Sequence, residues 1–202
     1  MLYYMPQAWT SDNTDAVERL SVQYGTSYVY PLRSMASYIS PSPNHQQGRS
    51  TNFMMRAEVA YFGTFGFGLD ITKFTEEEKE SAKAVIEEAK RNRKLIQYGD
   101  FYRLESPFQS NYVSWLCIDE DKKEFILGSY KILSKANPGS RRIKLSGLSP
   151  EKEYRCIETE DIYSGDQLMY FGFILPMEEA KEGDFISHIY HFSAIPEGTA
   201  IK

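Results

Sequence analysis

The sequence reads TEEEKESAKAVIEEAKRNRKLI from residue 75 to residue 96. Thr75, with Glu78 three residues later, forms a capping box, in which each side chain serves a free backbone N–H group of the first helical turn. The acidic residues there also suit the positive end of the helix dipole. Behind this cap lies one apolar stripe at helical spacing, made of Ala82, Val85, Ile86, Ala89 and Ile96. The stretch predicts a long amphipathic helix, and we interpret the basic residues 90–94 as its solvated face.

Short apolar runs alternate with helical patterns in the part of the chain before this helix. Three of these runs predict strands, at residues 2–5, 27–30 and 59–62. A helix is expected from Thr14 or Asp15 to Gly25, because apolar residues recur there at helical spacing. Prolines predict a long loop after residue 39, and glycines predict another loop over residues 63–68. The alternation is typical of the βα units of an α/β fold.

The pattern changes after residue 98. Short β-branched or aromatic runs follow, with turn-rich pieces between them, at residues 112–118, 125–133, 143–145, 154–157, 168–174 and 185–192. Strands at this spacing, without helices between them, predict an antiparallel sheet or a β-sandwich. We therefore expect an α/β region over residues 1–97 and an all-β domain over residues 98–202.

The composition excludes several classes of protein. The 202 residues carry 23 Lys and Arg against 28 Asp and Glu, a formal net charge of −5, and 42% of them are hydrophobic, which is typical of a globular chain. Because the basic residues form no block, nucleic acid is not an expected partner. No run approaches the roughly 18–20 apolar residues that span a bilayer, and the N-terminus lacks the features of a signal peptide. We expect a soluble, cytoplasmic protein without a membrane partner.

The two cysteines, Cys117 and Cys156, lie far apart in alternating apolar contexts. They could pair, but isolated cysteines are more often small buried hydrophobes. No set of Cys and His residues has the spacing of a zinc site. The glycine-rich residues 63–68 lack the lysine of a phosphate-binding loop. No metal or cofactor is expected.

The densest group of polar residues, WTSDNTD at residues 9–15, falls between a predicted strand and a predicted helix. That position is the carboxyl edge of a βα unit, where α/β folds assemble their active sites. Carboxylates and hydroxyls also cap helices, and Asp15 fits that task because the helical pattern starts right after it. Asp12 lies three residues earlier, where capping does not require it. Asp12 is therefore the candidate catalytic or ligand-binding carboxylate.

Two other polar groups are weaker candidates. Asn44, His45 and Gln46 in the proline-rich loop could reach a ligand, although a lone loop histidine is more often solvated or structural. His188 and His191 fall within one predicted strand, three residues apart, so they face opposite sides of it. We assign these two histidines no role.

Several pieces of the chain resemble the bacterial α-galactosidases of glycoside hydrolase family 36 in their order and spacing. They are LYYMPQAWTSDNTDAVERL (residues 2–20), QYGTS (23–27), YPL (30–32), SPNHQ (42–46), FGTFG (62–66), LD (69–70) and GDFYRL (99–104). The match covers essentially all of the chain. It implies a retaining glycosidase, with the C-terminal part of a (β/α)8 barrel over residues 1–97 and an antiparallel C-terminal β-sandwich over residues 98–202.

The same resemblance implies roles for two carboxylates. The first Asp of the family's Ser-Asp-x-x-Asp segment is its general acid/base and corresponds to Asp12, while Asp15 corresponds to the second, supporting carboxylate. The family's nucleophile lies on an earlier barrel strand in a Lys-Trp-Asp-type motif, which this chain does not contain. The family's enzymes are several times longer than this chain. The resemblance therefore implies a C-terminal piece that is inactive alone and needs the N-terminal part of the enzyme as a partner.

The resemblance further implies an α-galactoside substrate, such as melibiose or raffinose, and allows a homo-oligomer. A complete (β/α)8 barrel takes about 250 residues, so residues 1–97 supply at most about three of its units and predict an unpaired parallel edge. A second class of function stays open. In it, the chain is a non-catalytic sugar-binding or assembly module whose β-sandwich carries the function.

Overall fold

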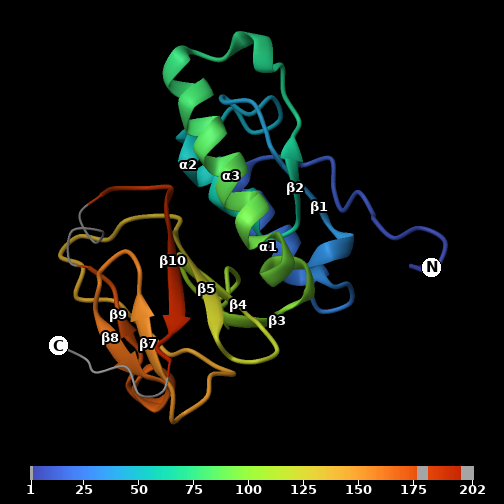
Figure 1. Cartoon of the computed structure of the whole chain (residues 1–202). Helices are drawn as coiled ribbons and strands as arrows, with labels where there is room; N and C mark the ends of the chain where they lie inside the picture. The colour runs from blue at the N-terminus through green and yellow to red at the C-terminus, as the bar shows by residue number, and fades with distance from the viewer. Residues whose placement is uncertain (1, 177–181, 197–202) are drawn as a thin grey trace.

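The computed structural model describes residues 2–176 and 182–196, and it has the two parts expected from the sequence (Figure 1). The first part holds the helices α1 (Ala16–Thr26), α2 (Phe53–Tyr61) and α3 (Glu76–Tyr98) and the parallel strands β1 (Ala36–Ile39) and β2 (Thr64–Phe67). Short 3₁₀ turns at Leu32–Ser34 and Ile71–Lys73 complete it. The second part is built mainly of antiparallel strands.

Helix α3 confirms the prediction made from its capping box. Thr75 Oγ1 accepts a hydrogen bond from the backbone N–H of Glu78 at 3.1 Å, and Glu78 Oε2 accepts one from the N–H of Thr75 at 3.1 Å. Ala82, Val85 and Ile96 of the predicted stripe are buried. Helix α1 is also confirmed, with Asp15 as its N-cap residue.

None of the three predicted early strands forms at its predicted residues. Residues 2–5 form no strand; their side chains are largely exposed, and the first strand-like contact is an isolated parallel bridge between Ala8 and Met35. Residues 27–30 form a turn, because their backbone N–H groups bond back to the end of α1, as in Ser27 N–H to Gln23 at 3.0 Å. The strand of this unit is β1, six residues beyond the predicted end.

The third predicted strand, at residues 59–62, belongs instead mostly to helix α2. Asn52 Oδ1 caps this helix by accepting a hydrogen bond from the N–H of Met55 at 2.6 Å. The glycine-rich residues 63–68, predicted as a loop, contain strand β2, which pairs in parallel with β1. A Cβ atom on Gly66 would lie 2.6 Å from the ring of Tyr38, so glycine lets that ring lie against β2.

The second part contains a sheet of six strands in the order β3-β4-β5-β10-β7-β8. The strands are β3 (Asp100–Glu105), β4 (Tyr112–Ile118), β5 (Glu124–Lys131), β7 (Glu153–Cys156), β8 (Ile162–Ser164) and β10 (Ile186–Ala194). A second layer pairs β6 (Arg142–Ile143) with β9 (Phe173–Ile174). Strands β3 and β8 were not predicted, and the predicted strand at 168–174 is a π-helical turn, Gln167–Phe171, followed by β9.

Alternate residues of the six-stranded sheet face two different cores, as the period of a β-strand requires. Trp115 and Cys117 of β4 face the helices, whereas Leu116 and Ile118 face the β6–β9 layer. The fold is therefore a barrel-type α/β segment followed by an antiparallel β domain, as predicted. The domain boundary at residue 97 stays a prediction, since Ile96 shares one core with Trp115.

The ring of Phe62 joins the two parts. It lies 5.4 Å from the ring of Trp115 and 6.3 Å from that of Phe101. A Cβ atom on Gly128 would come within 2.8 Å of the Phe62 ring, so β5 approaches this residue as closely as a glycine allows. Beside it, the hydroxyl of Tyr130 donates a hydrogen bond to the carbonyl oxygen of Glu58 in α2 at 2.9 Å.

An ion cluster around His191 joins α3 to the sheet a second time. His191 Nδ1 lies 2.6 Å from Glu158 Oε1, and His191 Nε2 lies 3.0 Å from Glu88 Oε1 of α3. Burial alone would lower the pKa of His191, but its hydrogen bonds to Glu158 and Glu88 and their charges raise it to about 9. The imidazole is therefore protonated at neutral pH and holds the two carboxylates together.

Among the described residues α3 is the longest helix, and neither it nor any other helix offers an apolar stretch that would cross a lipid bilayer.

Phe62→Ala is expected to lower the free energy of unfolding by about 3–5 kcal/mol, because it removes a fully buried ring from the core shared by both parts. Urea unfolding measures this loss. Phe108→Ala is the matched control: that ring is 69% exposed, and its removal should cost less than about 1 kcal/mol. Equal losses in the two variants would contradict the central place of Phe62.

The His191 cluster predicts a pH dependence. The pKa of His191 is raised from 6.5 to about 9 in the folded chain, so its stabilisation is complete below pH 6.5 and is lost as the pH rises through 9. Between pH 7 and pH 10 the chain should lose about 2–3 kcal/mol more stability than His191→Gln does. Urea unfolding at both pH values tests this, with the exposed-loop variant His45→Gln expected to behave like the unmodified chain. The same pH slope in His191→Gln would contradict it.

Candidate active site

Three segments end at one edge of the β1–β2 sheet. The bridge between Ala8 and Met35 is parallel, and β1 and β2 are also parallel, so all three segments run in the same direction. The helices cover one face of this pair, where Ile39 packs against Ala57 and Val85 (Figure 1). Residues that follow Ala8 therefore reach the carboxyl edge, where α/β folds place their active sites. Asp12 is one of these residues.

The carboxylate of Asp12 is exposed and has one hydrogen-bond partner among the described residues. Its Oδ1 accepts a hydrogen bond from Trp9 Nε1 at 2.8 Å. The ring of Trp9 lies 5.3 Å from that of Tyr38 on β1, with 30° between the ring planes. Tyr38 in turn covers Gly66 of β2. The tryptophan therefore orients the carboxylate next to an aromatic surface, and Asp12 Oδ2 stays available to a ligand.

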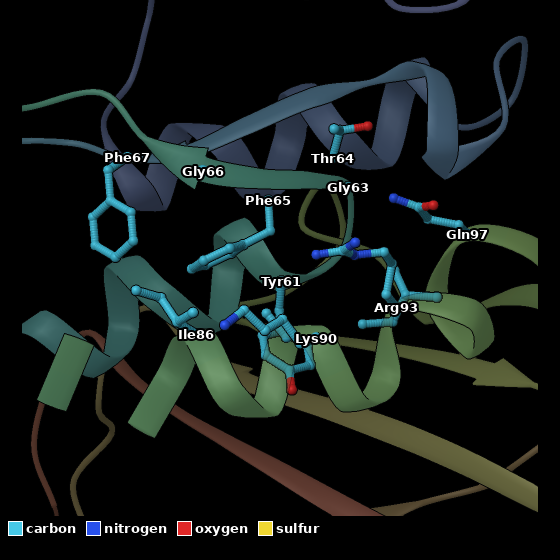
Figure 2. A pocket seen from close by; sticks show the side chains of 12 residues that line it. Tyr61, Gly63, Thr64, Phe65, Gly66, Phe67, Ile86, Lys90, Arg93 and Gln97 are labelled. Atoms are coloured by element: carbon cyan, nitrogen blue, oxygen red, sulfur yellow. The ribbon is translucent and has the colours of Figure 1, made fainter. Parts of the chain in front are cut away.

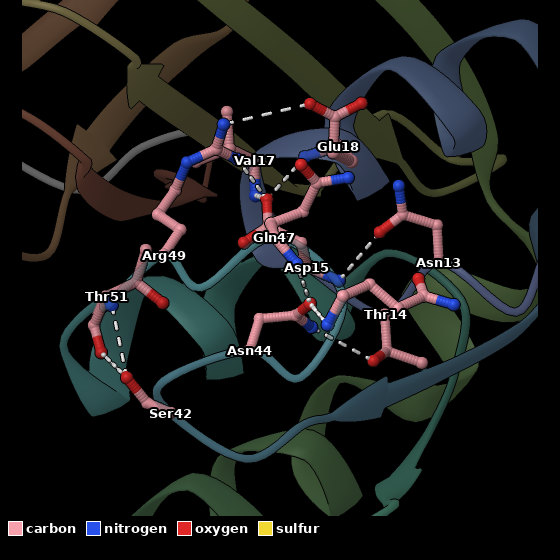
Figure 3. Close-up of polar contacts among 11 residues, drawn as sticks. Asn13, Thr14, Asp15, Val17, Glu18, Ser42, Asn44, Gln47, Arg49 and Thr51 are labelled. Carbon is pink, nitrogen blue, oxygen red and sulfur yellow. Dashed lines mark hydrogen bonds and ion pairs between the residues drawn. The ribbon is translucent and has the colours of Figure 1, made fainter.

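Asp15, the other carboxylate of this segment, is only 1% exposed. Its Oδ1 accepts hydrogen bonds from the backbone N–H groups of Val17 and Glu18, each at 3.1 Å, and it also pairs with Arg49 (Figure 3). The predicted helix-capping role of Asp15 is thus confirmed. A buried carboxylate that caps a helix and neutralises an arginine acts structurally.

The proline-rich loop is fastened to the start of α1 through Asn44, which is buried. Asn44 Nδ2 donates a hydrogen bond to Thr14 Oγ1 at 3.2 Å, and its Oδ1 accepts bonds from the N–H groups of Gln46 and Gln47 (Figure 3). His45 beside it is exposed. Asn44 therefore shapes the loop and holds it beside Asp15; the structure brings this loop to the polar segment, as a ligand-reaching loop would need.

Arg19 of α1 holds the backbone on either side of the candidate site. Its guanidinium donates to Thr10 Oγ1 at 2.7 Å and to the carbonyl oxygen of Ala36 in β1 at 2.9 Å. It also donates to Gln23 Oε1 at 3.2 Å. Burial lowers the pKa of Arg19 to about 10, which still leaves it charged at neutral pH. Thr10 is thereby fixed two residues before Asp12, so we regard Arg19 as a positioning residue.

Sequence reasoning missed both Arg19 and Arg49. Arg19 lies in a predicted helix, where an arginine is normally solvated, and Arg49 lies 34 residues from its partner Asp15. Nothing local signals either contact.

A third carboxylate at the same edge, Asp70 after β2, accepts hydrogen bonds from Thr72, which lower the pKa of Asp70.

The two histidines of β10, to which the sequence assigned no role, contact carboxylates. His188 Nε2 lies 2.6 Å from Glu182, and His191 belongs to the ion cluster on α3. Both cysteines, Cys117 and Cys156, are buried and free. Within the described part of the chain no three His, Cys, Asp or Glu side chains are arranged to hold a metal ion.

The two aspartates should separate in a stability measurement. Asp15→Ala removes a helix cap and leaves Arg49 without its buried partner, so it should lower the free energy of unfolding by about 2–4 kcal/mol. Asp12→Ala alters an exposed side chain and should change it by less than about 1 kcal/mol. Thermal or urea unfolding of both variants checks this. A large loss in Asp12→Ala would assign that carboxylate a structural role.

Two protein-family models match the chain. Residues 1–99 match the Melibiase family, and residues 112–192 match the glycosyl hydrolase family 36 C-terminal domain. Alpha-galactosidase AgaA of Geobacillus stearothermophilus is 45% identical over 197 residues, and alpha-galactosidase Mel36A of Lactobacillus acidophilus is 44% identical over 193 residues. These matches cover 98% and 96% of this chain but 26% of each relative. The chain thus spans about a quarter of the length of these relatives.

Solved structures agree with the sequence matches. A crystal structure of an AgaA variant in complex with raffinose superimposes with a TM-score of 0.92 at 44% identity, over 96% of this chain and 27% of that one. The α-galactosidase of Lactobacillus brevis gives a TM-score of 0.93 at 40% identity, over all of this chain and 28% of its own. Both parts of this chain have their counterparts in these enzymes. The chain belongs to glycoside hydrolase family 36, as a portion of its α-galactosidases.

Proposed function

We propose that this chain forms part of an α-galactosidase in which Asp12 is the general acid/base. The observation that supports this most directly is the contrast between the two aspartates of the polar segment. Asp15 is buried and its Oδ1 caps α1 and pairs with Arg49, whereas Asp12 lies exposed at the carboxyl edge with one oriented hydrogen bond, from Trp9. An acid that protonates a leaving group needs an oxygen within reach of the substrate and a fixed orientation.

In a retaining glycosidase two carboxyl groups about 5–5.5 Å apart divide the work. One attacks the anomeric carbon, while the acid transfers its proton to the glycosidic oxygen as the C–O bond breaks. The acid residue, now a carboxylate, then takes a proton from water as that water hydrolyses the glycosyl–enzyme intermediate. We assign the role of the acid to Asp12. Its proton moves from a carboxyl oxygen to the leaving sugar and is regained from water.

The first carboxyl group is assigned to the N-terminal part of the enzyme. This chain contains no Lys-Trp-Asp-type motif, and it spans about a quarter of its relatives. The proposed partner is therefore the rest of the barrel, and the chain alone is expected to be inactive. AgaA has been crystallised with raffinose and with stachyose, so terminal α-galactosides are the proposed substrates. A homo-oligomer and a cytoplasmic location stay predictions.

A second candidate function rests on the β domain. Tyr170 is 75% exposed and Phe171 is 48% exposed, and the guanidinium of Arg142 lies 4.5 Å from the centroid of the Phe171 ring. Exposed aromatic faces beside a cation suit a sugar ring or a partner protein. This surface favours the alternative of a non-catalytic sugar-binding or assembly module.

Hydrolysis of p-nitrophenyl α-galactoside and of raffinose tests the proposal. The purified chain is assayed alone and mixed with the N-terminal portion of AgaA, and Asp12→Ala is compared with the exposed-turn variant Asp121→Ala. We expect no hydrolysis alone, hydrolysis on mixing, and a loss of about 10²–10⁴-fold in Asp12→Ala but not in Asp121→Ala. The loss should be larger for raffinose, whose leaving group needs the proton more than p-nitrophenolate does.

Added azide sharpens the assignment. Azide can replace the water that an acid/base residue activates, so the mixture with Asp12→Ala should regain turnover of p-nitrophenyl α-galactoside and release α-galactosyl azide. Formation of the β-azide would instead identify Asp12 as the nucleophile. Hydrolysis by the chain alone would place a nucleophile within these residues and contradict the mechanism. Binding of galactosides without hydrolysis in any mixture would support the module.

A further inference from the structure

The face of the β1–β2 sheet that is turned away from the helices bears Tyr38 near its carboxyl end. Ser37 Oγ donates a hydrogen bond to Gln23 Oε1 of α1 at 2.8 Å, and Ile39 packs against the helices. Because side chains of a strand alternate, Tyr38 between them lies on the opposite face. In a (β/α)8 barrel the helices surround the strands, so this opposite face is the inner one. Tyr38 is the second-last residue of β1 and therefore lies near the edge that carries Asp12.

Strand β2 supplies a seat for the ring of Tyr38. The side chains of Phe65 and Phe67 lie on the α3 side of β2, where they line a cavity against that helix (Figure 2). Gly66 between them therefore faces the inner side, where the register pairs it with Tyr38. A Cβ atom on Gly66 would lie 2.6 Å from two ring carbons of Tyr38, and one on Gly68 would lie 3.3 Å from its Cβ. The tyrosine ring thus occupies the space that a side chain at residue 66 would need.

The ring of Tyr38 in turn packs against the indole of Trp9. The two ring centroids lie 5.3 Å apart, with 30° between the planes, and the indole is otherwise about half exposed. The indole N–H is the group that donates to Asp12 Oδ1 at 2.8 Å. A donor orients an exposed carboxylate only if packing fixes the donor's own rotamer. Rotation of the indole would move its N–H group away from Asp12.

We infer that Tyr38 is a positioning residue for the general acid and acts through Trp9. The inference rests on the proposed function, because it takes Asp12 as that acid. The glycines of β2 seat the Tyr38 ring, the ring holds the indole, and the indole N–H holds one oxygen of Asp12. Proton transfer to a glycosidic oxygen depends steeply on the alignment of the acid, so a loosened indole slows that step.

Solvent exchange of the two indole N–H groups, followed by NMR on the full chain, tests this seating without any activity. The exchange at Trp9 should become at least about tenfold faster in Asp12→Ala, which removes the acceptor, and also in Tyr38→Ala and Gly66→Ala, which remove or displace the ring. Trp115 Nε1 is buried in the core and serves as the internal reference, since its exchange should stay the same in all three variants.

Two conservative variants are the matched controls for this measurement. Tyr38→Phe keeps the aromatic ring that packs on the indole. Gly25→Ala makes the same change as Gly66→Ala at a glycine whose added Cβ atom would meet no atom within 4 Å. Both should leave the exchange at Trp9 within about twofold of the unmodified chain.

Hydrolysis by the mixture with the N-terminal portion of AgaA gives the second readout. In Tyr38→Ala, kcat/KM for raffinose should fall about tenfold with KM within about twofold, because the sugar leaving group depends on a well-aligned acid. For p-nitrophenyl α-galactoside kcat/KM should stay within about twofold, since p-nitrophenolate leaves without a proton. Tyr38→Phe should hydrolyse raffinose like the unmodified chain. A loss of folded protein would instead lower both substrates alike.

The outcomes separate this inference from the proposed function. Faster exchange at Trp9 in Tyr38→Ala, without hydrolysis in any mixture, would support the seating and contradict the acid/base role of Asp12. Hydrolysis that needs Asp12, with unchanged exchange at Trp9 in Tyr38→Ala, would overturn the inference and support the proposed function. A raised KM for raffinose at unchanged kcat would make Tyr38 a contact of the sugar and overturn its positioning role. Equal losses for both substrates, or equal exchange in Gly66→Ala and Gly25→Ala, would overturn it as well.

Discussion

The burial of Phe62 is the constraint on which most of this structure depends. The residue follows α2 and precedes β2, so its position fixes where the helix ends and where the strand begins. Its ring contacts Trp115 of β4 and closely approaches Gly128 of β5, which brings the βα part onto one face of the six-stranded sheet. In a close-packed core, one element cannot shift far without displacing the elements packed against it. The direction of β2 is therefore set partly by the sheet of the following domain.

This dependence explains why the two parts differ in sequence pattern and yet share one buried core. Ile96 of α3 and Leu20 of α1 lie in the same buried cluster as Trp115 and Tyr130. The ion cluster of His191 adds a polar contact between α3 and the sheet. The C-terminal domain thus acts as a rigid support for the last helix of the α/β part. A support of this kind keeps the carboxyl edge, and with it Asp12, in one geometry.

The sequence predicted the elements whose signals are local. Helix α3 has a complete capping box, α1 has its cap at Asp15, and β4, β5 and β10 are β-branched or aromatic runs between turns. The incorrect strand predictions have a common cause: a short apolar run does not show which segment it packs against. Residues 59–62 look like a strand, yet they continue a helix whose buried residues include Met55, Ala57 and Val59. Residues 2–5 look like a strand, yet in the structure Tyr3, Tyr4 and Met5 are largely exposed.

The candidate site likewise has features that the sequence could predict and features that it could not. The separation of Asp12 from Asp15 was predictable, because helix capping is a local pattern and accounts for only one of the two carboxylates. The arginines were not predictable, because Arg49 meets Asp15, and Arg19 meets Thr10 and Ala36, through contacts that only the tertiary structure creates. Asp12 itself has a single local partner, Trp9.

The two carboxylates of residues 9–15 therefore differ in both burial and hydrogen bonding. Asp15, the structural carboxylate, is held by two backbone amides and an arginine, whereas the catalytic candidate Asp12 keeps an oxygen free at the carboxyl edge. A general acid works in a water-excluded site, and Asp12 is exposed in this chain. The walls of such a site have to come from further strands and loops at the same edge. In a closed barrel each strand pairs with two neighbours, so strands that complete the sheet beyond β2 also carry loops to the carboxyl edge where Asp12 lies. Among the described residues β2 pairs with β1 alone, and the exposed carboxylate of Asp12 lies at the carboxyl edge of the same parallel sheet.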